Sequence, residues 1–222
     1  MKHEYIRTHI TAEPFSNPHV RKVIDGVIEN ALLSLRDEWT TGRVFSDTRP
    51  TFRVHGCDPF ARESFTTQHN QGQKWITNDF NEMMPTLYHL EAHEFADLML
   101  ENQRMFDVLV FDPPYNLSQL KRQYEGIGKT LPHWQTLRPW HRCKDTLAKC
   151  VRVGGYAVSM GFGSRCRFGD RRGFKTLAIY NIEPAGTEDR YNIQLVVEEK
   201  TQTALSDYVS KKKNFSSEPN KK

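Results

Sequence analysis

The segment FDVLVFDPPY, residues 106–115, places an apolar run directly before two adjacent prolines. An apolar run on both faces is typical of a buried strand in a parallel sheet that is covered by helices. Proline has no backbone N–H and keeps the residue before it extended, so the loop 112–115 is stiff and rich in acceptor carbonyls. In open α/β sheets, ligands bind just beyond the carboxyl ends of strands, which makes this loop the first candidate site.

The chemistry of this loop suits an amino group as substrate. The Asp112 carboxylate and the neighbouring carbonyls accept hydrogen bonds, and Tyr115 offers a flat face on which a planar ring can stack. We therefore predict a catalytic role for Asp112, Pro113, Pro114 and Tyr115. The competing interpretation is a proline-rich turn that merely ends a buried strand.

Hydrophobic periodicity predicts an α/β fold with strands and helices in alternation. Helices are expected over 17–39, 91–102 and parts of 117–152. The expected strands are 51–57, 74–78, 87–90, 106–111, 156–160, 176–182 and 193–198. The last two would form an antiparallel pair, which predicts a mostly parallel twisted sheet of about seven strands with an antiparallel edge strand and helices on both faces.

Length and composition predict one domain over residues 1–200, with an N-terminal helical segment over 1–50, and a basic, flexible tail over 201–222. No apolar run approaches the ~20 residues of a membrane span. Residues 1–30 lack the apolar stretch of a signal peptide. Four cysteines in 222 residues are too few for a disulfide scaffold, which favours a reducing, cytoplasmic environment.

The charge is concentrated beside the proline loop. The whole chain has a net charge of +4, but residues 121–175 hold 13 basic and three acidic side chains. Such a segment suits a polyanion, although a solvated basic surface gives the same count. Trp134 and Trp140 add stacking surface for nucleic acid, unless they belong to the core. The basic candidates are Lys121, Arg122, Lys129, Arg138, Arg142, Lys144, Lys149, Arg165, Arg167, Arg171 and Arg172.

A strand followed by Asp-Pro-Pro-Tyr resembles the S-adenosylmethionine-dependent N6-adenine DNA methyltransferases. The segment CDPFA, residues 57–61, is similar to the cofactor motif of that family. In this resemblance Asp79 takes the position of the acid that holds the ribose, and Glu91 that of the acid that contacts the cofactor's adenine. The cofactor-binding residues it implies are Asp58, Pro59, Phe60, Ala61, Asp79, Phe80, Glu91 and Ala92.

The resemblance covers roughly residues 51–200 and implies a Rossmann-like methyltransferase fold, as in small phage and archaeal members of the family. It implies transfer of a methyl group from S-adenosylmethionine to the N6 amine of adenine in DNA, with short or loose sequence specificity. We expect a monomer or homodimer in the cytoplasm, or in the host cytoplasm for a virus-encoded protein, with no membrane partner.

Alternatives stay open at this point. Arg62-Glu63-Ser64 stands where the family usually has Gly-Ser-Gly, which leaves room for a catalytically silent subunit that binds nucleic acid. N4-cytosine and RNA are alternative substrates because the amine chemistry is alike, whereas Asp at 112 and the basic flank argue against a protein amide. Cys143, Cys150, Cys166 and His141 are irregularly spaced, so we expect reduced thiols and no metal site.

Overall fold

The structure is a computed structural model of the whole chain. The residues that it describes are 2–8, 18–40, 54–61, 66, 73–132, 140–162, 166–184 and 193–202. Predictions made for Arg62-Glu63-Ser64, Trp134, Arg138, Arg165 and most of the tail therefore lie outside the described residues.

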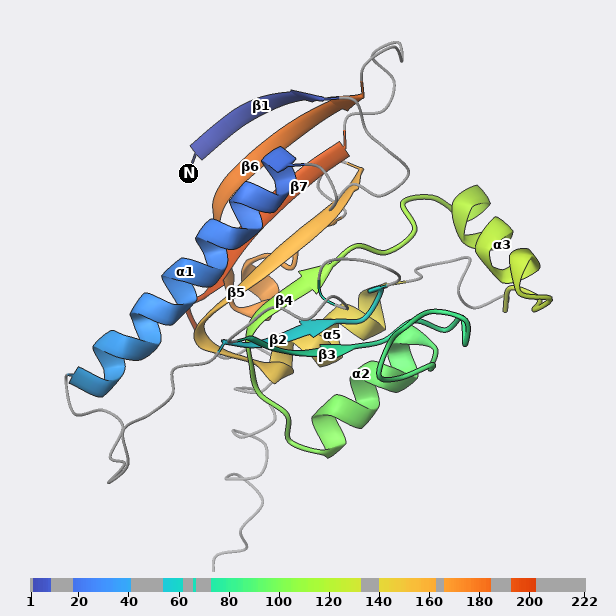
Figure 1. Cartoon of the computed structure of the whole chain (residues 1–222), viewed down its shortest axis with the longest axis horizontal. Helices are drawn as coiled ribbons and strands as arrows, with labels where there is room; N and C mark the ends of the chain where they lie inside the picture. Colours follow the sequence, from blue (N-terminus) through green and yellow to red (C-terminus); the bar gives the residue numbers. More distant parts are fainter. Residues whose placement is uncertain are drawn as a thin grey trace, which may run out of the picture.

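The described strands are β1 (Lys2–Thr8), β2 (Val54–Asp58), β3 (Gln73–Thr77), β4 (Phe106–Phe111), β5 (Val151–Phe162), β6 (Phe174–Pro184) and β7 (Ile193–Lys200). They form one seven-stranded sheet in the order β1-β6-β7-β5-β4-β2-β3 (Figure 1). Neighbouring strands are parallel, except that β7 runs antiparallel to both β5 and β6. The central position of β4 explains why its sequence is apolar on both faces.

The described helices are α1 (Pro18–Thr40), α2 (Ala92–Glu101), α3 (Leu117–Gly126) and α5 (His141–Cys150), with the short 3-10 helix η3 (Asp170–Arg172). In Figure 1, α1 lies on one face of the sheet and α2 and α5 on the other. The apolar residues of α1 recur at helical spacing and share a core with Val108 and Val110. Those of α2 and α5 share a second core with Leu109 and Phe111. This architecture is a Rossmann-like α/β fold, in which helices cover both faces of a mostly parallel sheet, as predicted.

Strand β4 carries one charged residue in an otherwise apolar run. The Asp107 carboxylate accepts a hydrogen bond from the His55 backbone N–H at 2.7 Å and pairs with Arg152. The three residues belong to β2, β4 and β5, and Asp107 is only 6% exposed. Paired in this way, the charge ties together three neighbouring strands instead of being buried alone.

Three sequence predictions about the sheet are wrong. Residues 87–90 do not form a strand, since only Tyr88 bridges to Asn78 and Leu87 is 66% exposed. The segment 1–50 is not wholly helical, because β1 precedes α1. Because β7 pairs with β5 on one side and with β6 on the other, this antiparallel strand lies inside the sheet and not at its edge.

Gly56 shows how closely β2 packs against its neighbour. A Cβ atom at this position would lie 2.2 Å from a ring carbon of Trp75. We expect Gly56→Ala to lower the free energy of unfolding by about 2–3 kcal/mol, because overpacking a tight core forces side chains off their preferred rotamers.

Urea denaturation checks this prediction, with Gly26→Ala on α1 as the matched control. Among the described residues, no atom outside the adjoining backbone of α1 lies within 4 Å of the added Cβ at Gly26, and alanine favours a helix over glycine by about 0.5–1 kcal/mol. The control should keep or gain stability. An unchanged midpoint for Gly56→Ala would contradict the close packing described above.

Candidate functional site

The Asp-Pro-Pro-Tyr loop leaves β4 at the carboxyl end of the strand, as the sequence predicts, and runs into α3. Asn116 caps α3 by accepting a hydrogen bond from the Gln119 backbone N–H at 2.8 Å. The Gln119 side chain in turn accepts one from the Tyr115 backbone N–H at 2.9 Å. This reciprocal cap resembles a capping box and fixes the exit of the loop.

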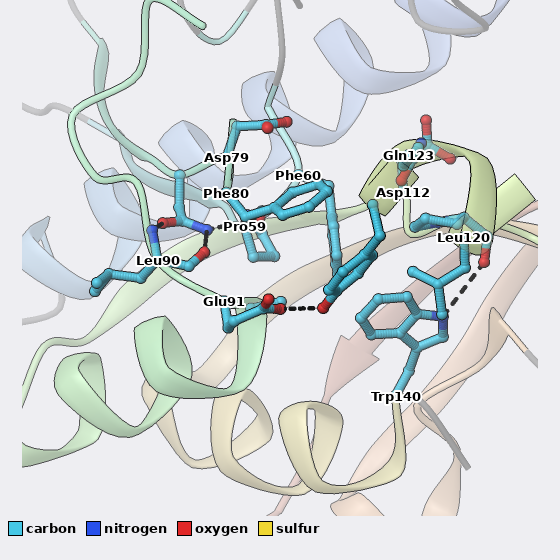
Figure 2. Close-up of a pocket in the computed structure, with 14 residues that line it drawn as sticks. Pro59, Phe60, Asp79, Phe80, Leu90, Glu91, Asp112, Leu120, Gln123 and Trp140 are labelled. Atoms are coloured by element: carbon cyan, nitrogen blue, oxygen red, sulfur yellow. Dashed lines mark hydrogen bonds between the residues drawn. The ribbon is translucent and has the colours of Figure 1, made fainter. Parts of the chain in front are cut away.

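An open pocket lies beside this loop (Figure 2). Eight predicted site residues line it: Pro59, Phe60, Asp79, Phe80, Glu91, Ala92, Asp112 and Pro114. Five further lining residues escaped the sequence analysis: Asn78, Leu90, Leu120, Gln123 and Tyr124. Trp140, which the sequence analysis named only as stacking surface for nucleic acid, lines the pocket as well. The pocket therefore brings the loop after β4 together with the segments that follow β2 and β3.

Asp58 does not line the pocket but holds the turn that carries the lining residue Phe60. One of its carboxylate oxygens accepts a hydrogen bond from the Phe60 backbone N–H at 3.1 Å, and the other accepts one from the Thr66 hydroxyl at 2.8 Å. Asp58 is only 1% exposed, and neither it nor Ala61 lines the pocket. These contacts shape the turn that presents Phe60, whose ring meets Phe111 edge-on at 5.2 Å.

Asn78 joins two walls of the pocket. Its amide nitrogen donates to the carbonyls of Pro59, at 3.2 Å, and Leu90, at 3.0 Å. Its amide oxygen accepts from the Leu90 backbone N–H at 2.9 Å. The side chain is 1% exposed, so one buried amide holds the turn after β2 against the segment that leads to Glu91.

Two carboxylates, Asp79 and Glu91, line one end of the pocket. Asp79 follows β3 and accepts a hydrogen bond from the Asn81 backbone N–H at 2.8 Å. Glu91 precedes α2 and accepts one from the Tyr124 hydroxyl at 2.5 Å. The Tyr124 ring also lies against Phe80, with 4.9 Å between ring centroids. Helix α3 thus closes on these residues through Tyr124.

Tyr115 and Pro113 are not among the lining residues. Pro113 is buried, and the Tyr115 hydroxyl points to the Met160 sulfur at 3.9 Å. The Tyr115 ring meets Phe162 at 5.4 Å. The structure therefore packs Tyr115 against the end of β5, on the side of the sheet that α1 covers.

The basic candidates do not form one surface. Lys121, Arg122 and Lys129 lie on or just after α3 and are exposed, although Lys121 pairs with Glu125. Arg142 pairs with Asp97 on α2. Lys149 lies in the last turn of α5, at the end remote from the pocket residue Trp140.

The loop before β6 corrects part of the basic prediction. Arg171 and Arg172 lie in η3, directly before β6 begins. Because β6 runs in the same direction as β4, its start lies at the end of the sheet opposite to the end that carries Asp112. Arg172 is engaged within the protein, because it pairs with Asp145 at 2.7 Å and donates to the Phe168 carbonyl at 2.9 Å. Arg167 is only partly exposed.

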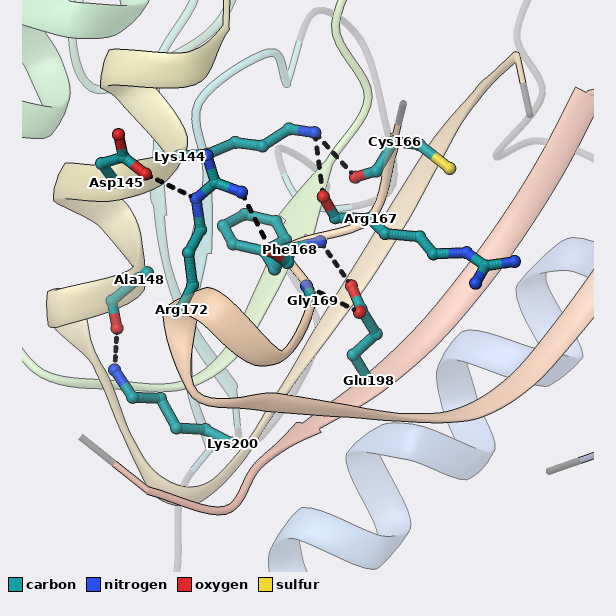
Figure 3. Close-up of polar contacts among 10 residues, drawn as sticks. All are labelled: Lys144, Asp145, Ala148, Cys166, Arg167, Phe168, Gly169, Arg172, Glu198 and Lys200. Carbon is teal, nitrogen blue, oxygen red and sulfur yellow. Dashed lines mark hydrogen bonds and ion pairs between the residues drawn. The ribbon is translucent and has the colours of Figure 1, made fainter. Parts of the chain in front are cut away.

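Lys144 is likewise not a surface residue. It is 5% exposed and donates hydrogen bonds to the carbonyls of Cys166, at 3.0 Å, and Arg167, at 3.2 Å (Figure 3). Buried Glu198 accepts from the backbone N–H groups of Phe168, at 2.7 Å, and Gly169, at 3.0 Å. Together the two charged side chains hold the loop that precedes β6.

Burial lowers the pKa of Lys144 from 10.5 to about 8, because the ammonium loses its hydration. Between these two values the folded chain binds fewer protons than the unfolded chain, so stability rises with pH. The contribution is present above pH 10.5 and lost as the pH falls through 8. From pH 7.5 to 9.5, we expect the wild type to gain about 1–2 kcal/mol of unfolding free energy relative to Lys144→Met.

Urea titrations at pH 7.5, 8.5 and 9.5 measure this difference. Subtracting the unfolding free energy of the variant from that of the wild type cancels the contributions of the titratable groups that both proteins share. Nearby Cys166 does not interfere in this window, since burial raises the pKa of its thiol to about 11. A difference that is constant over the three pH values would show that Lys144 does not titrate there.

The cysteines and His141 are the residues that the sequence analysis weighed as metal ligands. All four cysteines are buried, reduced thiols, and burial raises the pKa of the Cys150 thiol to about 11. His141 is exposed at the start of α5. Among the residues that the structure describes, no three His, Cys, Asp or Glu side chains gather in a way that could hold a metal ion. None of the described helices is both long and apolar enough to cross a membrane.

No protein-family model and no curated protein sequence matches the chain. A solved structure from Streptococcus mutans, described as a SAM-dependent methyltransferase, aligns with a TM-score of 0.45 at 7% identity, over 66% of this chain and 44% of its own. An rRNA methylase from Streptococcus thermophilus aligns with a TM-score of 0.40 at 13% identity, over 71% and 100%. The Methanococcus jannaschii fibrillarin pre-rRNA processing protein gives 0.43 at 10%, over 70% and 71%.

The chain thus spans less than half the length of the Streptococcus mutans protein. TM-scores below 0.5 at such low identities give no ground for transferring an activity or a substrate. What the protein does has to be argued from its own residues.

Proposed function

We propose that this protein transfers a methyl group from S-adenosylmethionine to the N6 amine of adenine in DNA. The observation that carries the proposal is the position of Asp112 and Pro114 in the wall of a pocket that Asp79 and Glu91 also line. An acceptor-rich loop for an amine then adjoins a pocket that is lined by carboxylates and aromatic rings. The resemblance of the loop to the N6-adenine enzymes supplies the choice of base.

The pocket residues fit this cofactor chemically. Two carboxylates suit the hydroxyl and amino groups of an adenosine moiety, and Phe60 and Phe80 offer aromatic surface to its ring. Acceptor oxygens around Asp112 also suit a positively charged sulfonium group. When bound, S-adenosylmethionine supplies an activated methyl group, so the protein's task is binding and alignment.

Asp112 does the chemical work on the substrate side. The lone pair of an exocyclic adenine amine is delocalised into the ring, which makes the nitrogen a weak nucleophile. A hydrogen bond from one of its N–H groups to the Asp112 carboxylate, which lines the pocket, would localise that lone pair. The base has to leave the helical stack to reach this loop, as in other enzymes that act on bases.

Lys121, Arg122 and Lys129 are the basic residues best placed to contact the phosphate backbone. They lie on or beside α3, which begins directly after the Asp-Pro-Pro-Tyr loop and covers the pocket. Arg171 and Arg172, by contrast, lie where β6 begins, at the end of the sheet opposite to Asp112. Contacts to phosphate from α3 would hold a strand near the pocket without reading its sequence.

Nucleoside mass spectrometry after incubation with mixed DNA, mixed RNA and cofactor tests the proposal. N6-methyladenine in DNA is the expected product. N4-methylcytosine, or product in RNA only, would replace the proposed substrate by one of the alternatives. Calorimetric titration with S-adenosylmethionine covers the silent-subunit alternative, for which neither heat nor thermal stabilisation would be seen.

A further inference from the structure

Trp140 touches both halves of the proposed site. Its indole N–H donates a hydrogen bond to the Pro114 carbonyl at 3.3 Å. Its ring meets the Phe60 ring edge-on, with 4.9 Å between centroids and an interplanar angle of 82°. Pro114 belongs to the loop that carries Asp112, and Phe60 belongs to the turn after β2. One side chain therefore bridges the loop that would hold the substrate and the turn that would hold the cofactor (Figure 2).

The backbone of Trp140 is held in place at the start of α5. Trp140 is the residue before α5, and its carbonyl accepts the Lys144 backbone N–H at 2.9 Å as the helix begins. On the next residues, Arg142 pairs with Asp97 and so ties α5 to α2. The buried Lys144 fastens the first turns of α5 to the loop before β6. The indole is thus presented from a fixed helix end.

We propose that Trp140 is a positioning residue that aligns the Asp112 loop with the cofactor-binding turn. This inference rests on the proposed function. By holding the Pro114 carbonyl, the indole fixes the direction of the loop two residues away from Asp112. By packing on Phe60, it fixes the distance between the two loops. Methyl transfer in line from donor to amine is sensitive to such alignment, since small displacements of the reacting groups cost rate.

Trp140→Phe tests the hydrogen bond, because it keeps an aromatic ring against Phe60 and removes the indole N–H. We expect kcat to fall about three- to tenfold, while the Kd for S-adenosylmethionine stays within twofold and the Tm is unchanged. Trp140→Leu removes the aromatic contact as well, so cofactor binding should also weaken, about five- to tenfold. Trp75→Phe, in the core under α1, is the control that should leave kcat unchanged.

A second readout does not depend on activity. In ¹⁵N-labelled ligand-free protein, the indole resonance that Trp140→Phe removes should exchange slowly with solvent, because its N–H is hydrogen-bonded. Rapid exchange like that of an exposed indole, or wild-type kcat in Trp140→Phe, would overturn the inference alone. A protected indole in a wild type that transfers no methyl group would instead mark the failure of the proposed function, and the positioning role would fall with it.

Discussion

Asp112→Ala should lower methyl transfer by about 10²–10³-fold while the fold and the affinity for S-adenosylmethionine stay close to those of the wild type. Removal of one preorganised hydrogen-bonding group from a reacting centre typically has an effect of this size. The carboxylate lies at the end of β4, in the wall of the pocket, where it would accept the N–H of the substrate amine. Alanine leaves the two prolines, and hence the stiffness of the loop, in place.

Initial rates with a labelled methyl donor measure this loss, and thermal melts check the fold. Asp170→Ala is the matched control, since Asp170 is an exposed aspartate in η3, at the end of the sheet opposite to Asp112. It should leave the rate unchanged. A variant without Asp112 that turns over as fast as the wild type would remove Asp112 from the mechanism, and the proposed substrate chemistry would have to be rebuilt.

The local signals in the sequence predicted most of the architecture. The bounds of β4 agree with the predicted strand, and α1 agrees to within one residue at each end. The apolar residues of α1 recur at helical spacing and those of β4 form a continuous run, and both are strong local signals. The strand predicted over 87–90 failed because the segment is short and Leu87 faces solvent, so that only Tyr88 bridges to a neighbouring residue. β1 escaped notice because its pairing partner, β6, lies far along the chain.

The site was predictable only where a motif marks it. Asp112 and Glu91 stand next to strand or helix ends that the sequence reveals. Trp140 and Tyr124 act through partners that lie 26 and 33 residues away in the chain, so no local pattern shows their contacts. Counting charges failed for the same reason, because the count cannot show that Asp145 lies beside Arg172 in the folded chain.

Asn78→Ala should destabilise the protein and weaken cofactor binding together. The change removes three hydrogen bonds and leaves the carbonyls of Pro59 and Leu90 and the Leu90 N–H without their partner. Buried polar groups that lose a partner cost about 1–3 kcal/mol each, less where water can enter. We therefore expect a loss of about 2–3 kcal/mol in unfolding free energy, measured in urea.

The binding effect follows from the position of those three bonds. They hold the turn that presents Phe60 against the segment that presents Glu91, so their loss lets the two walls move apart. We expect the Kd for S-adenosylmethionine, measured by calorimetry at a temperature where the variant is folded, to rise at least about tenfold. Asn81→Ala is the control, since the Asn81 side-chain oxygen accepts only an exposed hydrogen bond, from the Met83 N–H. If Asn78→Ala lost stability but bound the cofactor as tightly as Asn81→Ala, this amide would support the fold without shaping the pocket.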